Sequence, residues 1–592
     1  MAMGVAMSVR RSTNTENLVR GADTLLHQGT MLAKAALWAI SSGVLVGSVV
    51  VSIGASLVTT STERTFAYKH IAAKTKVFFS QEKHSVDLVI NGKEVSLPAD
   101  QVAIVTSGIF EKVRARVALV GLFGLIVGGA TSGALVLYWR RRGSKQAEDE
   151  FIRGARLVDG QQLDGLIRED NKSGNVTIAG VHTVKGGEML HTMISGAVGT
   201  GKSVSIFEIL DSVRAQGKRA IVYDPTGEFT EYYYREGRDV ILNPLDGRSP
   251  NWNLWREIRS DFDYRSFAAS LVQVKSQTDP FFEQSARIIA EELFRKLAQT
   301  GGATNQAVYD AAAKLTLQEL FELLKGTSGA NLIDPAGERT ALSVRSAFLN
   351  AMNSFRYLHD EGEAFSIREW VADESSDSWL FIPSRRDQHE AIKPLITLWL
   401  DIAIRGVMNL PPIREPRFWL VVDELPSLQK IEALQTAVTE TRKYGLCGVF
   451  GIQSVSQMRE LYGKDGAQTV MGMCQTWVVL RVADSETAKY LSETLGQADI
   501  QEKDEGLSFG AESNRDGTNL VSKRTERAIV LASEIQHLPD LEGYMRVPGP
   551  YPVAKIKLQY RSREKIAAPF VPRQQGVFAA APTEVVDSDP FA

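Results

Sequence analysis

A glycine-rich stretch in the first half of the chain has the residue types and spacing of a phosphate-binding loop. Glycines let backbone N–H groups turn toward phosphates, the lysine reaches the β- and γ-phosphates, and the serine after it ligates Mg²⁺. Apolar residues precede the stretch and an amphipathic run follows it, which is the strand, loop and helix context that this motif needs. We therefore predict that ATP and Mg²⁺ are bound by Gly196, Ala197, Val198, Gly199, Thr200, Gly201, Lys202 and Ser203.

An apolar run that ends in two adjacent carboxylates lies much further along the chain. Residues 418–422, FWLVV, predict a buried strand, and Asp423 and Glu424 follow it directly. Asp423 would hold the magnesium, directly or through water, and Glu424 would polarise the attacking water as a general base. Activation of water needs a carboxylate beyond the metal ligand. The pair therefore favours ATP hydrolysis over simple storage of a nucleotide.

Other polar side chains could complete such a site. Gln453 closes the next apolar segment, where its amide could hydrogen-bond the γ-phosphate and the water, or could be a plain strand-end residue. Arg442 is expected on a helix along the outside of the sheet, either as an arginine finger for a neighbouring subunit's ATP or as part of a solvated face. Asp224 could join the outer shell of the magnesium or only brace the loop. The role of Glu228 stays open.

The elements that must position these residues are short apolar runs separated by helical segments, which predict an α/β fold with a mainly parallel, covered sheet. Between about residues 257 and 372 the strand-like runs stop and helical periodicity replaces them, so an all-α block is inserted between the phosphate loop and the acidic pair. The candidate strands are residues 176–184, 220–224, 240–242, 379–382, 418–422, 448–452 and 477–482.

Two uncharged segments, residues 35–58 and 117–139, are each long enough to cross a bilayer, for which about 20 apolar residues suffice. A signal peptide is the alternative for the first, although the apolar part of a signal has only about 7–15 residues, and a buried core helix is the alternative for the second. The basic cluster at residues 140–145 favours a cytoplasmic location for everything that follows. Close contacts between membrane helices are predicted at the pairs Gly43/Gly47, Gly124/Gly128 and Gly129/Gly133.

Composition excludes several classes of protein. With 592 residues, 44% hydrophobic and 23% charged, the chain is neither a small disulfide-stapled scaffold nor a disordered polymer. A net charge of -3 argues against a generally basic nucleic-acid coat protein, but it allows a local basic channel. Cys447 and Cys474 lie in apolar runs and are expected to be core residues of a reduced protein. Two spans build no site at the membrane midplane, which disfavours a small-molecule transporter.

These patterns divide the chain into expected domains. The loop between the two spans shows the alternation of a small β-hairpin, and the Ala- and Pro-rich C-terminus reads as a flexible tail. The expected divisions are a cytoplasmic N-terminal segment (1–34), a transmembrane helix (35–58), a periplasmic hairpin domain (59–116), a transmembrane helix (117–139), the first part of a nucleotide-binding domain (140–256), an all-α domain (257–372), the second part of the nucleotide-binding domain (373–563) and the tail (564–592).

The ordered set of motifs resembles the type IV secretion coupling proteins of conjugative plasmids, in the TraG/TraD family. The two apolar spans and the phosphate loop come first, and the resemblance covers nearly the whole chain. The further motifs are YDPTGEF at 223–229, LNPLD at 242–246, DPFF at 279–282, DELP at 423–426, RKYG at 442–445, FGIQS at 450–454, LPDL at 538–541 and VPGPYP at 547–552.

This resemblance implies a RecA-like motor with an inserted all-α domain that assembles as a homohexamer at the bacterial inner membrane. It implies ATP hydrolysis coupled to delivery of single-stranded plasmid DNA, with its attached relaxase, into a secretion channel. The implied partners are the relaxase, relaxosome accessory proteins, and the ATPases and inner-membrane components of the channel. Longer members carry an acidic tail that contacts a relaxosome protein, and the tail here is short. The implied roles are Lys202 and Ser203 for phosphate and magnesium, Asp423 and Glu424 as the Walker B pair, Gln453 as the sensor and Arg442 as the finger supplied in trans.

Two other functions fit the same motifs. A double-stranded DNA translocase of the FtsK and HerA kind shares the motor and the membrane tether, but it normally reads duplex DNA through a winged-helix module, which we do not expect after residue 560. A membrane receptor could use ATP only to assemble and dock protein substrates without pumping DNA. Replacing Glu424 by Gln distinguishes the motor from the receptor.

Overall fold

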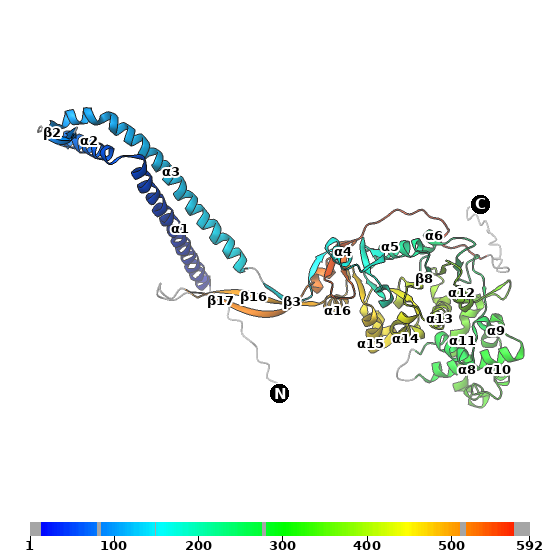
Figure 1. Cartoon of the computed structure of the whole chain (residues 1–592). Helices are drawn as coiled ribbons and strands as arrows, with labels where there is room; N and C mark the ends of the chain where they lie inside the picture. Colours follow the sequence, from blue (N-terminus) through cyan, green and yellow to red (C-terminus); the bar gives the residue numbers. More distant parts are fainter. Residues whose placement is uncertain are drawn as a thin grey trace, which may run out of the picture. The chain divides into compact units, whose positions relative to one another are not determined.

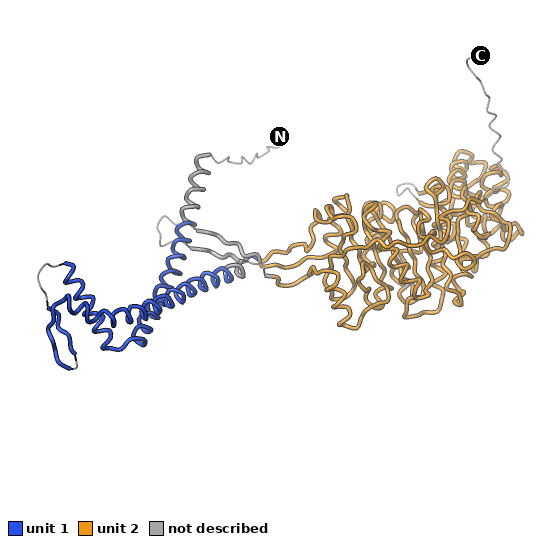
Figure 2. Tube along the Cα trace, turned by 90° about the horizontal axis from the view of Figure 1, so that it is seen from above, with its two compact units in different colours: residues 1–150, 502–523 blue, residues 151–501, 524–592 orange. Residues whose placement is uncertain are grey.

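The computed structural model describes residues 14–79, 85–90, 92–147, 150–274, 280–508 and 517–573. The chain divides into two compact units, one made of residues 1–150 with 502–523 and the other of residues 151–501 with 524–592 (Figure 2). The residues with predicted chemistry all belong to the second unit.

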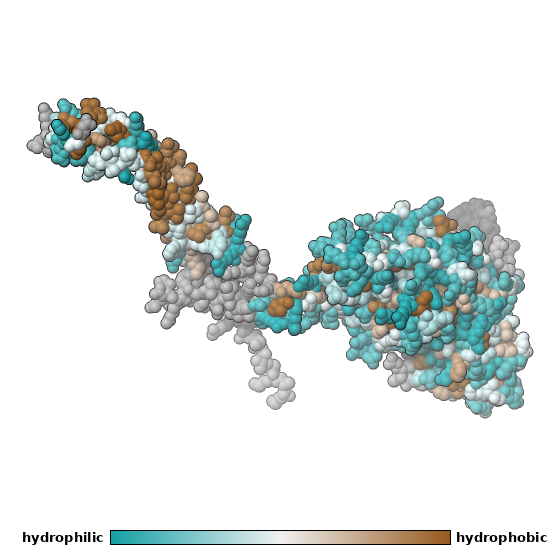
Figure 3. All heavy atoms as spheres, in the orientation of Figure 1, coloured by the Kyte–Doolittle hydropathy of each residue, from teal (hydrophilic) through white to brown (hydrophobic). Residues whose placement is uncertain are grey.

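The first unit consists of two long helices that pack along each other and a small cap (Figure 1). Within them, residues Gly29–Val58 and Ala99–Arg142 are long and apolar enough to cross a membrane, and this part of the surface is largely hydrophobic (Figure 3). The cap contains the expected hairpin, with Leu88 opposite Val95, and also a helix that the sequence analysis did not predict. The elements are α1 (Asn14–Val58), α2 (Ser61–Phe79), β1 (Ser85–Ile90), β2 (Lys93–Pro98) and α3 (Ala99–Ala147).

Two of the three predicted glycine pairs lie where α1 and α3 touch. A Cβ atom on Gly43 would lie 2.5 Å from the carbonyl oxygen of Gly128, and one on Gly47 would lie 2.9 Å from that of Gly124. Since real Cβ atoms do not approach so closely, these positions require glycine. Cβ atoms on Gly129 or Gly133 would meet nothing within 4 Å. Contrary to the prediction, this pair therefore makes no close contact between helices of the described part of this chain.

The second unit is built around a ten-stranded mixed sheet with the order β4-β19-β18-β15-β7-β14-β13-β8-β12-β9. From β15 to β9 all neighbours are parallel, whereas β18 runs antiparallel to both of its neighbours. The predicted α/β fold with a parallel core is confirmed. The strands are β4 (Leu157–Asp159), β7 (Thr192–Ser195), β8 (Arg219–Asp224), β9 (Val240–Ile241), β12 (Leu380–Pro383), β13 (Phe418–Val422), β14 (Leu446–Ile452), β15 (Thr476–Val479), β18 (Glu542–Arg546) and β19 (Val553–Lys557).

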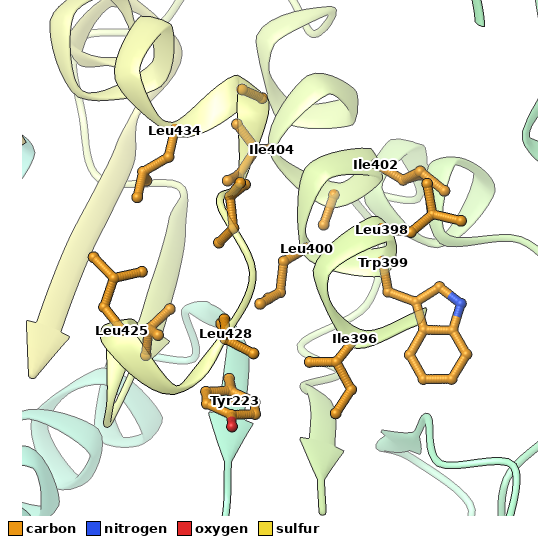
Figure 4. Close-up of a cluster of buried hydrophobic side chains, with 14 of the residues drawn as sticks. Tyr223, Ile396, Leu398, Trp399, Leu400, Ile402, Ile404, Leu425, Leu428 and Leu434 are labelled. Atoms are coloured by element: carbon orange, nitrogen blue, oxygen red, sulfur yellow. The ribbon is translucent and has the colours of Figure 1, made fainter. Parts of the chain in front are cut away.

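Both faces of this sheet are buried, which explains the continuous apolar runs. Successive residues of a strand alternate between two hydrophobic clusters: Tyr223 belongs to one and Val222 to the other. Figure 4 shows part of the first cluster, where side chains of α13 and of the segment after the acidic pair gather near Tyr223. Helices that bury side chains in the first cluster are α13 (His389–Met408), α14 (Glu432–Glu440), α15 (Val455–Met473) and α16 (Ser485–Leu495), and those in the second are α4 (Gly160–Glu169), α5 (Lys202–Ala215) and α6 (Glu228–Tyr233).

A block of helices is inserted between β9 and β12, as predicted, and it shares the first cluster. Its start and end lie side by side, because β10 (Asn251–Trp252) pairs in parallel with β11 (Ala364–Phe365). The helices are α7 (Asp261–Leu271), α8 (Phe281–Thr300), α9 (Asn305–Ala313), α10 (Leu317–Leu323), α11 (Glu338–Met352) and α12 (Ile367–Ala372).

One candidate strand is wrong. Residues 176–184 do not form a single strand of the main sheet but contribute to a separate hairpin, β5 (Ser173–Ile178) and β6 (Val181–Val184), which packs on α5. The chain reverses at Ala179 and Gly180, both with positive φ. The turn was not predicted because alanine is not a typical turn residue. The remaining described elements are β3 (Glu150–Gly154), β16 (Gln497–Ser508), α17 (Ala532–Gln536) and β17 (Gly517–Ala528).

The C-terminal segment also differs from the expectation of a tail that starts at residue 564. Residues 563–573, called the C-terminal strap below, are bound to the second unit. Arg563 contacts Asp211 at 2.6 Å, and the backbone N–H groups of Ile566 and Ala567 donate to the carbonyl oxygen of Glu231. Residues 574–592 lie outside the described residues, as do residues 1–13 at the other end.

The two cysteines are buried and free, as predicted. Cys447 lies within β14, and Cys474 directly follows α15. Burial raises the pKa of both thiols, which makes them unreactive core residues.

Candidate nucleotide-binding site

The predicted phosphate loop connects β7 to α5 at the carboxyl edge of the parallel strands. Gly199 and Gly201 adopt left-handed backbone conformations, with φ of 79° and 113°, which glycine accepts without strain. A Cβ atom on Gly201 would lie 2.9 Å from the side chain of Leu558, so a larger residue does not fit there. Lys202 begins α5, and Val198 at the tip of the loop is 80% exposed. The loop therefore has the strand, turn and helix geometry that phosphate binding needs.

Strand order brings the acidic pair and Gln453 to the same edge. Strand β14 lies between β7 and β13, so residues that follow these three strands are neighbours although they are far apart in the sequence. Lys202 Nζ lies 2.5 Å from Glu424 Oε2, and Gln453 Nε2 donates to the same oxygen at 2.7 Å. Gly451 permits this approach, because a Cβ there would collide with the backbone of Asp423. The predicted lysine, base and sensor are thus assembled in one place.

Two further carboxylates stand at the ends of neighbouring strands. Asp423 follows β13 and Asp224 ends β8, and burial raises the pKa of each to about 6, with smaller contributions from nearby negative charge. Oδ2 of Asp224 accepts hydrogen bonds from the backbone and the hydroxyl of Thr230, so Asp224 braces the start of α6. Oδ1 of each aspartate is buried and has no hydrogen-bond partner. Such oxygens are available to a cation or to its bound water.

Glu228, whose role the sequence left open, begins α6 directly after Gly227. Burial and the negative charge of Asp423 raise the pKa of its carboxyl, whereas hydrogen bonding with the Ser203 side chain opposes that rise. Glu228 therefore lies close to both predicted magnesium ligands, Ser203 and Asp423.

The residues present fit a magnesium ion that is shared with a nucleotide. Mg²⁺ prefers oxygen ligands, and it usually takes only one or two from protein, with phosphates and water supplying the others. The Ser203 hydroxyl and the unpartnered oxygen of Asp423 are groups of this kind. Among the described residues, no group of three His, Cys, Asp or Glu side chains could hold a metal ion. Phosphate oxygens would have to complete the coordination.

Arg442 is not brought to this site. It lies exposed in a short 3₁₀ turn, Thr441–Tyr444, after α14, rather than on the helix that was expected. The turn precedes β14, whereas Gln453 follows it, and the seven residues of that strand separate the two by about 20 Å. Arg442 lines a cavity of about 1370 Å³ at the amino edge of the sheet, together with three other cations, Lys185, Arg414 and Lys443.

Comparison with known proteins identifies the family. The family described as the type IV secretion-system coupling protein DNA-binding domain matches residues 175–559, which include the phosphate loop, the acidic pair and Gln453. The chain belongs to this coupling-protein family. It is 34% identical over 440 residues to the coupling protein TraD of Escherichia coli K12, an alignment that covers 73% of this chain and 61% of TraD. The chain thus spans less than two thirds of that relative.

Solved coupling-protein structures share the fold of the second unit. The unbound monoclinic form of the bacterial conjugative coupling protein TrwBΔN70 is 32% identical, with a TM-score of 0.65, and the match covers 72% of this chain and 96% of that one. The plasmid coupling protein TrwB in complex with ADP and Mg²⁺ is 31% identical, with a TM-score of 0.64, over 72% and 97% of the two chains.

Sequence reasoning missed two features around this coupling-protein site. The ion pair between Lys202 and Glu424 depends on strand order, which no local pattern reveals. The C-terminal strap is held by backbone hydrogen bonds and single side chains, so it has no apolar periodicity. One sequence feature could have indicated the strap, namely Pro569, because proline restricts a chain to extended conformations. In the structure, the carbonyl oxygen of Pro569 would lie 2.8 Å from a Cβ on Gly227.

Proposed function

We propose that this chain is an ATP-driven coupling protein that delivers single-stranded plasmid DNA into a type IV secretion channel during conjugation. The observation that carries the proposal is the convergence of Lys202, Glu424 and Gln453 at one edge of the sheet. Membership of the coupling-protein family and the ADP and Mg²⁺ held by TrwB support it. We propose hydrolysis in addition to nucleotide binding, because Glu424 supplies a carboxylate besides that of Asp423, the proposed metal ligand.

The residues of the site suggest how hydrolysis proceeds. Lys202 exchanges Glu424 for the β- and γ-phosphates when a nucleotide enters, which leaves Glu424 free to accept a proton from water. Gln453, already beside Glu424, orients that water. Ser203 and Asp423 hold the magnesium, which neutralises charge on the phosphates when it is bound.

Arg442 acts on the nucleotide of a neighbouring copy in this proposal. Its place at the amino edge, about 20 Å from Gln453 along β14, rules out a contact with the phosphates of its own loop. The cations beside it form a cavity that suits an anionic group presented by another subunit. We therefore propose a homohexamer with nucleotide sites between subunits.

The first unit anchors the protein in the bacterial inner membrane, and the motor lies in the cytoplasm. Two helices that could cross a membrane and the basic residues at 140–142 support this orientation. The partners we propose are the relaxase, relaxosome accessory proteins, and the ATPases and inner-membrane components of the channel. The domain divisions that we propose are the expected ones with two changes: residues 564–573 belong to the motor, and residues 502–523 group with the first unit.

The test is ATP turnover by the full chain in detergent, measured over a protein concentration series with and without single-stranded DNA. We expect turnover that rises steeply with concentration and with DNA and that is abolished by Lys202→Ala. Mixtures of inactive Lys202→Ala and Arg442→Ala subunits should regain activity, because some sites then combine an intact loop with an intact finger. Turnover that ignores DNA would favour a docking receptor, and preference for duplex DNA would favour an FtsK-like translocase.

A further inference from the structure

We propose that Tyr223, Ser427 and His389 are positioning residues for Glu424, because they hold the turn after the acidic pair and so direct the Glu424 carboxylate toward the attacking water. This inference rests on the proposed function, since it deepens the hydrolysis that is assigned to Glu424. It is carried by a series of hydrogen bonds that joins the backbone of Glu424 to two neighbouring strands and to the start of α13.

A short turn after the acidic pair holds the backbone of Glu424. This 3₁₀ turn, Leu425–Ser427, follows Glu424 directly. The carbonyl oxygen of Glu424 accepts hydrogen bonds from the Ser427 hydroxyl at 2.7 Å and from the Ser427 backbone N–H at 3.2 Å. The place of Ser427 therefore sets the orientation of the Glu424 backbone, and with it the direction in which the carboxylate leaves the chain.

Tyr223 fixes the Ser427 hydroxyl from inside the core. Its side chain is fully buried in β8, and its hydroxyl lies 2.9 Å from Ser427 Oγ. Because the single proton of the Ser427 hydroxyl is donated to Glu424, Tyr223 is the donor in this bond. Tyr223 is also opposite Val422 in the pairing of β8 with β13. The support for Ser427 thus comes from the strand beside the one that carries the acidic pair.

His389, the first residue of α13, holds the backbone of Ser427. Its Nε2 lies 2.9 Å from the carbonyl oxygen of Ser427, so Nε2 carries a proton, and Nδ1 of the neutral ring accepts from the Ser384 hydroxyl at 3.1 Å. Ser384 directly follows β12, and its backbone N–H donates to the carbonyl oxygen of Asp224 at 3.1 Å. The ends of β12, β8 and β13 are therefore tied together at the edge of the sheet where the site lies.

Glu424 needs this support when a nucleotide binds. In the structure its carboxylate is held by Lys202 and Gln453. In the proposed mechanism Lys202 moves to the phosphates, so the direction of the carboxylate then depends more on the Glu424 backbone. A general base acts only within hydrogen-bond reach of the water, and a misplacement of about 1 Å can cost about 100-fold in rate. The positioning residues act through Glu424, so they should affect the rate of hydrolysis and not nucleotide affinity.

A purely structural role predicts a different result. Loss of a buried hydrogen bond lowers the stability of the fold. Molecules that remain folded would then keep their rate of hydrolysis, or would lose rate and nucleotide affinity together as the site loosens. The two roles can therefore be separated by measuring kcat and nucleotide affinity in the same variants.

The experiment measures ATP turnover and binding of fluorescent ADP with Mg²⁺ by the full chain in detergent, with single-stranded DNA present. For Tyr223→Phe, which removes one hydroxyl and keeps the buried ring, we expect kcat to fall about tenfold and ADP affinity to stay within about twofold. The matched control is Tyr462→Phe, which removes another buried hydroxyl, the acceptor of the Ile431 backbone N–H at 3.3 Å. It should keep the kcat of the unmodified protein.

A second comparison asks whether Tyr223 acts through Glu424. When Tyr223→Phe is added to Glu424→Gln, it should cause no further fall in the remaining turnover, because the residue through which it acts is already inactive. A further tenfold fall would overturn the proposal. Unchanged kcat in Tyr223→Phe, or equal falls in Tyr223→Phe and Tyr462→Phe, would overturn it as well.

His389 is tested by two amides of different length. The amide of His389→Gln reaches about as far as Nε2 and can donate to the carbonyl oxygen of Ser427, so kcat should stay above about half. The shorter amide of His389→Asn does not reach Ser427, and kcat should fall about tenfold. Equal kcat in these two variants would contradict the assignment of His389.

Ser427→Ala keeps the proposal testable if Tyr223→Phe does not fold. It removes both hydroxyl bonds at a residue that is only half-buried. We expect the same tenfold fall in kcat with ADP affinity retained, and unchanged kcat would overturn the proposal. Absence of ATP turnover by the unmodified protein would instead refute the proposed hydrolysis.

Discussion

Lys202 and Glu424 form an ion pair, with Nζ 2.5 Å from Oε2, between the phosphate loop and the end of β13. Gln453 donates to the same carboxylate oxygen at 2.7 Å. Glu424, the proposed general base, is therefore paired with the cation that we propose to bind phosphate. In the proposed mechanism, Glu424 can activate water only after a nucleotide has drawn Lys202 away.

Glu424→Gln should separate binding from hydrolysis. The amide cannot accept the proton of the attacking water, so we expect ATP turnover to fall at least about 100-fold. Affinity for ADP with Mg²⁺ should stay the same or rise, because Lys202 loses its anionic competitor. Steady-state turnover and fluorescent-ADP binding measure the two effects. Glu322→Gln, in α10 where the carboxylate pairs with Lys325 at the surface, is the control, and retention of a tenth of the activity by Glu424→Gln would contradict the assignment.

Gly128→Leu should separate α1 from α3. A side chain there would meet the backbone of Gly43, where a Cβ would lie 2.6 Å from the carbonyl oxygen. Cysteines placed at Ala39 and Ser132 report the contact, because the Ser132 hydroxyl lies 2.9 Å from the carbonyl oxygen of Ala39. We expect cross-linking between them to fall by at least about half.

The neighbouring Gly129→Leu supplies the control, since Gly129 has nothing within 4 Å of its Cβ position. Cross-linking in this variant should equal that of the parent. Equal yields in both leucine variants would show that the helices do not depend on this close approach.

His191 makes the motor unit sensitive to acid. Its ring is buried just before β7, Nδ1 accepts a hydrogen bond from the backbone N–H of Gly448 at 3.0 Å, and burial lowers its pKa to about 4. An unfolded histidine titrates near pH 6.5, so this contribution to stability is present above pH 6.5 and is lost as the pH falls toward 4, by up to about 3 kcal/mol.

Hydrogen exchange at the Gly448 amide measures this loss directly. The protection factor of this amide, which is already corrected for the intrinsic exchange rate, should decrease as the pH falls from 6.5 to 4.5. His191→Gln should flatten this dependence, because glutamine can accept the same bond and does not titrate. A dependence that survives in His191→Gln would place the sensitivity elsewhere.

Arg563→Ala should release the C-terminal strap. The guanidinium contacts Asp211 at 2.6 Å and lies over the ring of Phe207, 4.6 Å from its centroid. Loss of both contacts should destabilise the motor by about 1–2 kcal/mol and increase proteolysis after residue 560. Arg561→Ala removes an exposed arginine nearby and should change neither. Equal proteolysis of the two variants would contradict this anchoring role.

Local apolar patterns predicted the core of the motor, because fully buried strands are continuous apolar runs. Strand β13 occupies the predicted residues, Phe418–Val422, and this places Asp423 and Glu424 at a strand end. The phosphate loop was predictable for a similar reason, since its glycines serve a local backbone shape. The position of a site residue was predictable where it depends only on the segment that contains the residue.

Features that depend on distant segments were not predictable. Helix α2 buries only Ala67, His70 and Ala73, so it shows no apolar stripe. The pairing of Lys202 with Glu424 follows from the place of β14 between β7 and β13, which is set by packing of the whole sheet. The strap is held mainly by hydrogen bonds to α6 and to the turn near Asp246, and such contacts leave no periodicity in the sequence.

The paired ends of the helical block have a consequence for how such chains can vary. Strands β10 and β11 hold the entry and the exit of the block beside each other, with Trp252 opposite Phe365. Residues can therefore be gained or lost among α8 to α11 without a change in the path of the strands that carry Lys202 and Glu424. The helices of the block can therefore vary while the strands that carry the site keep their register, and an engineer could exchange the block between relatives at the same two points.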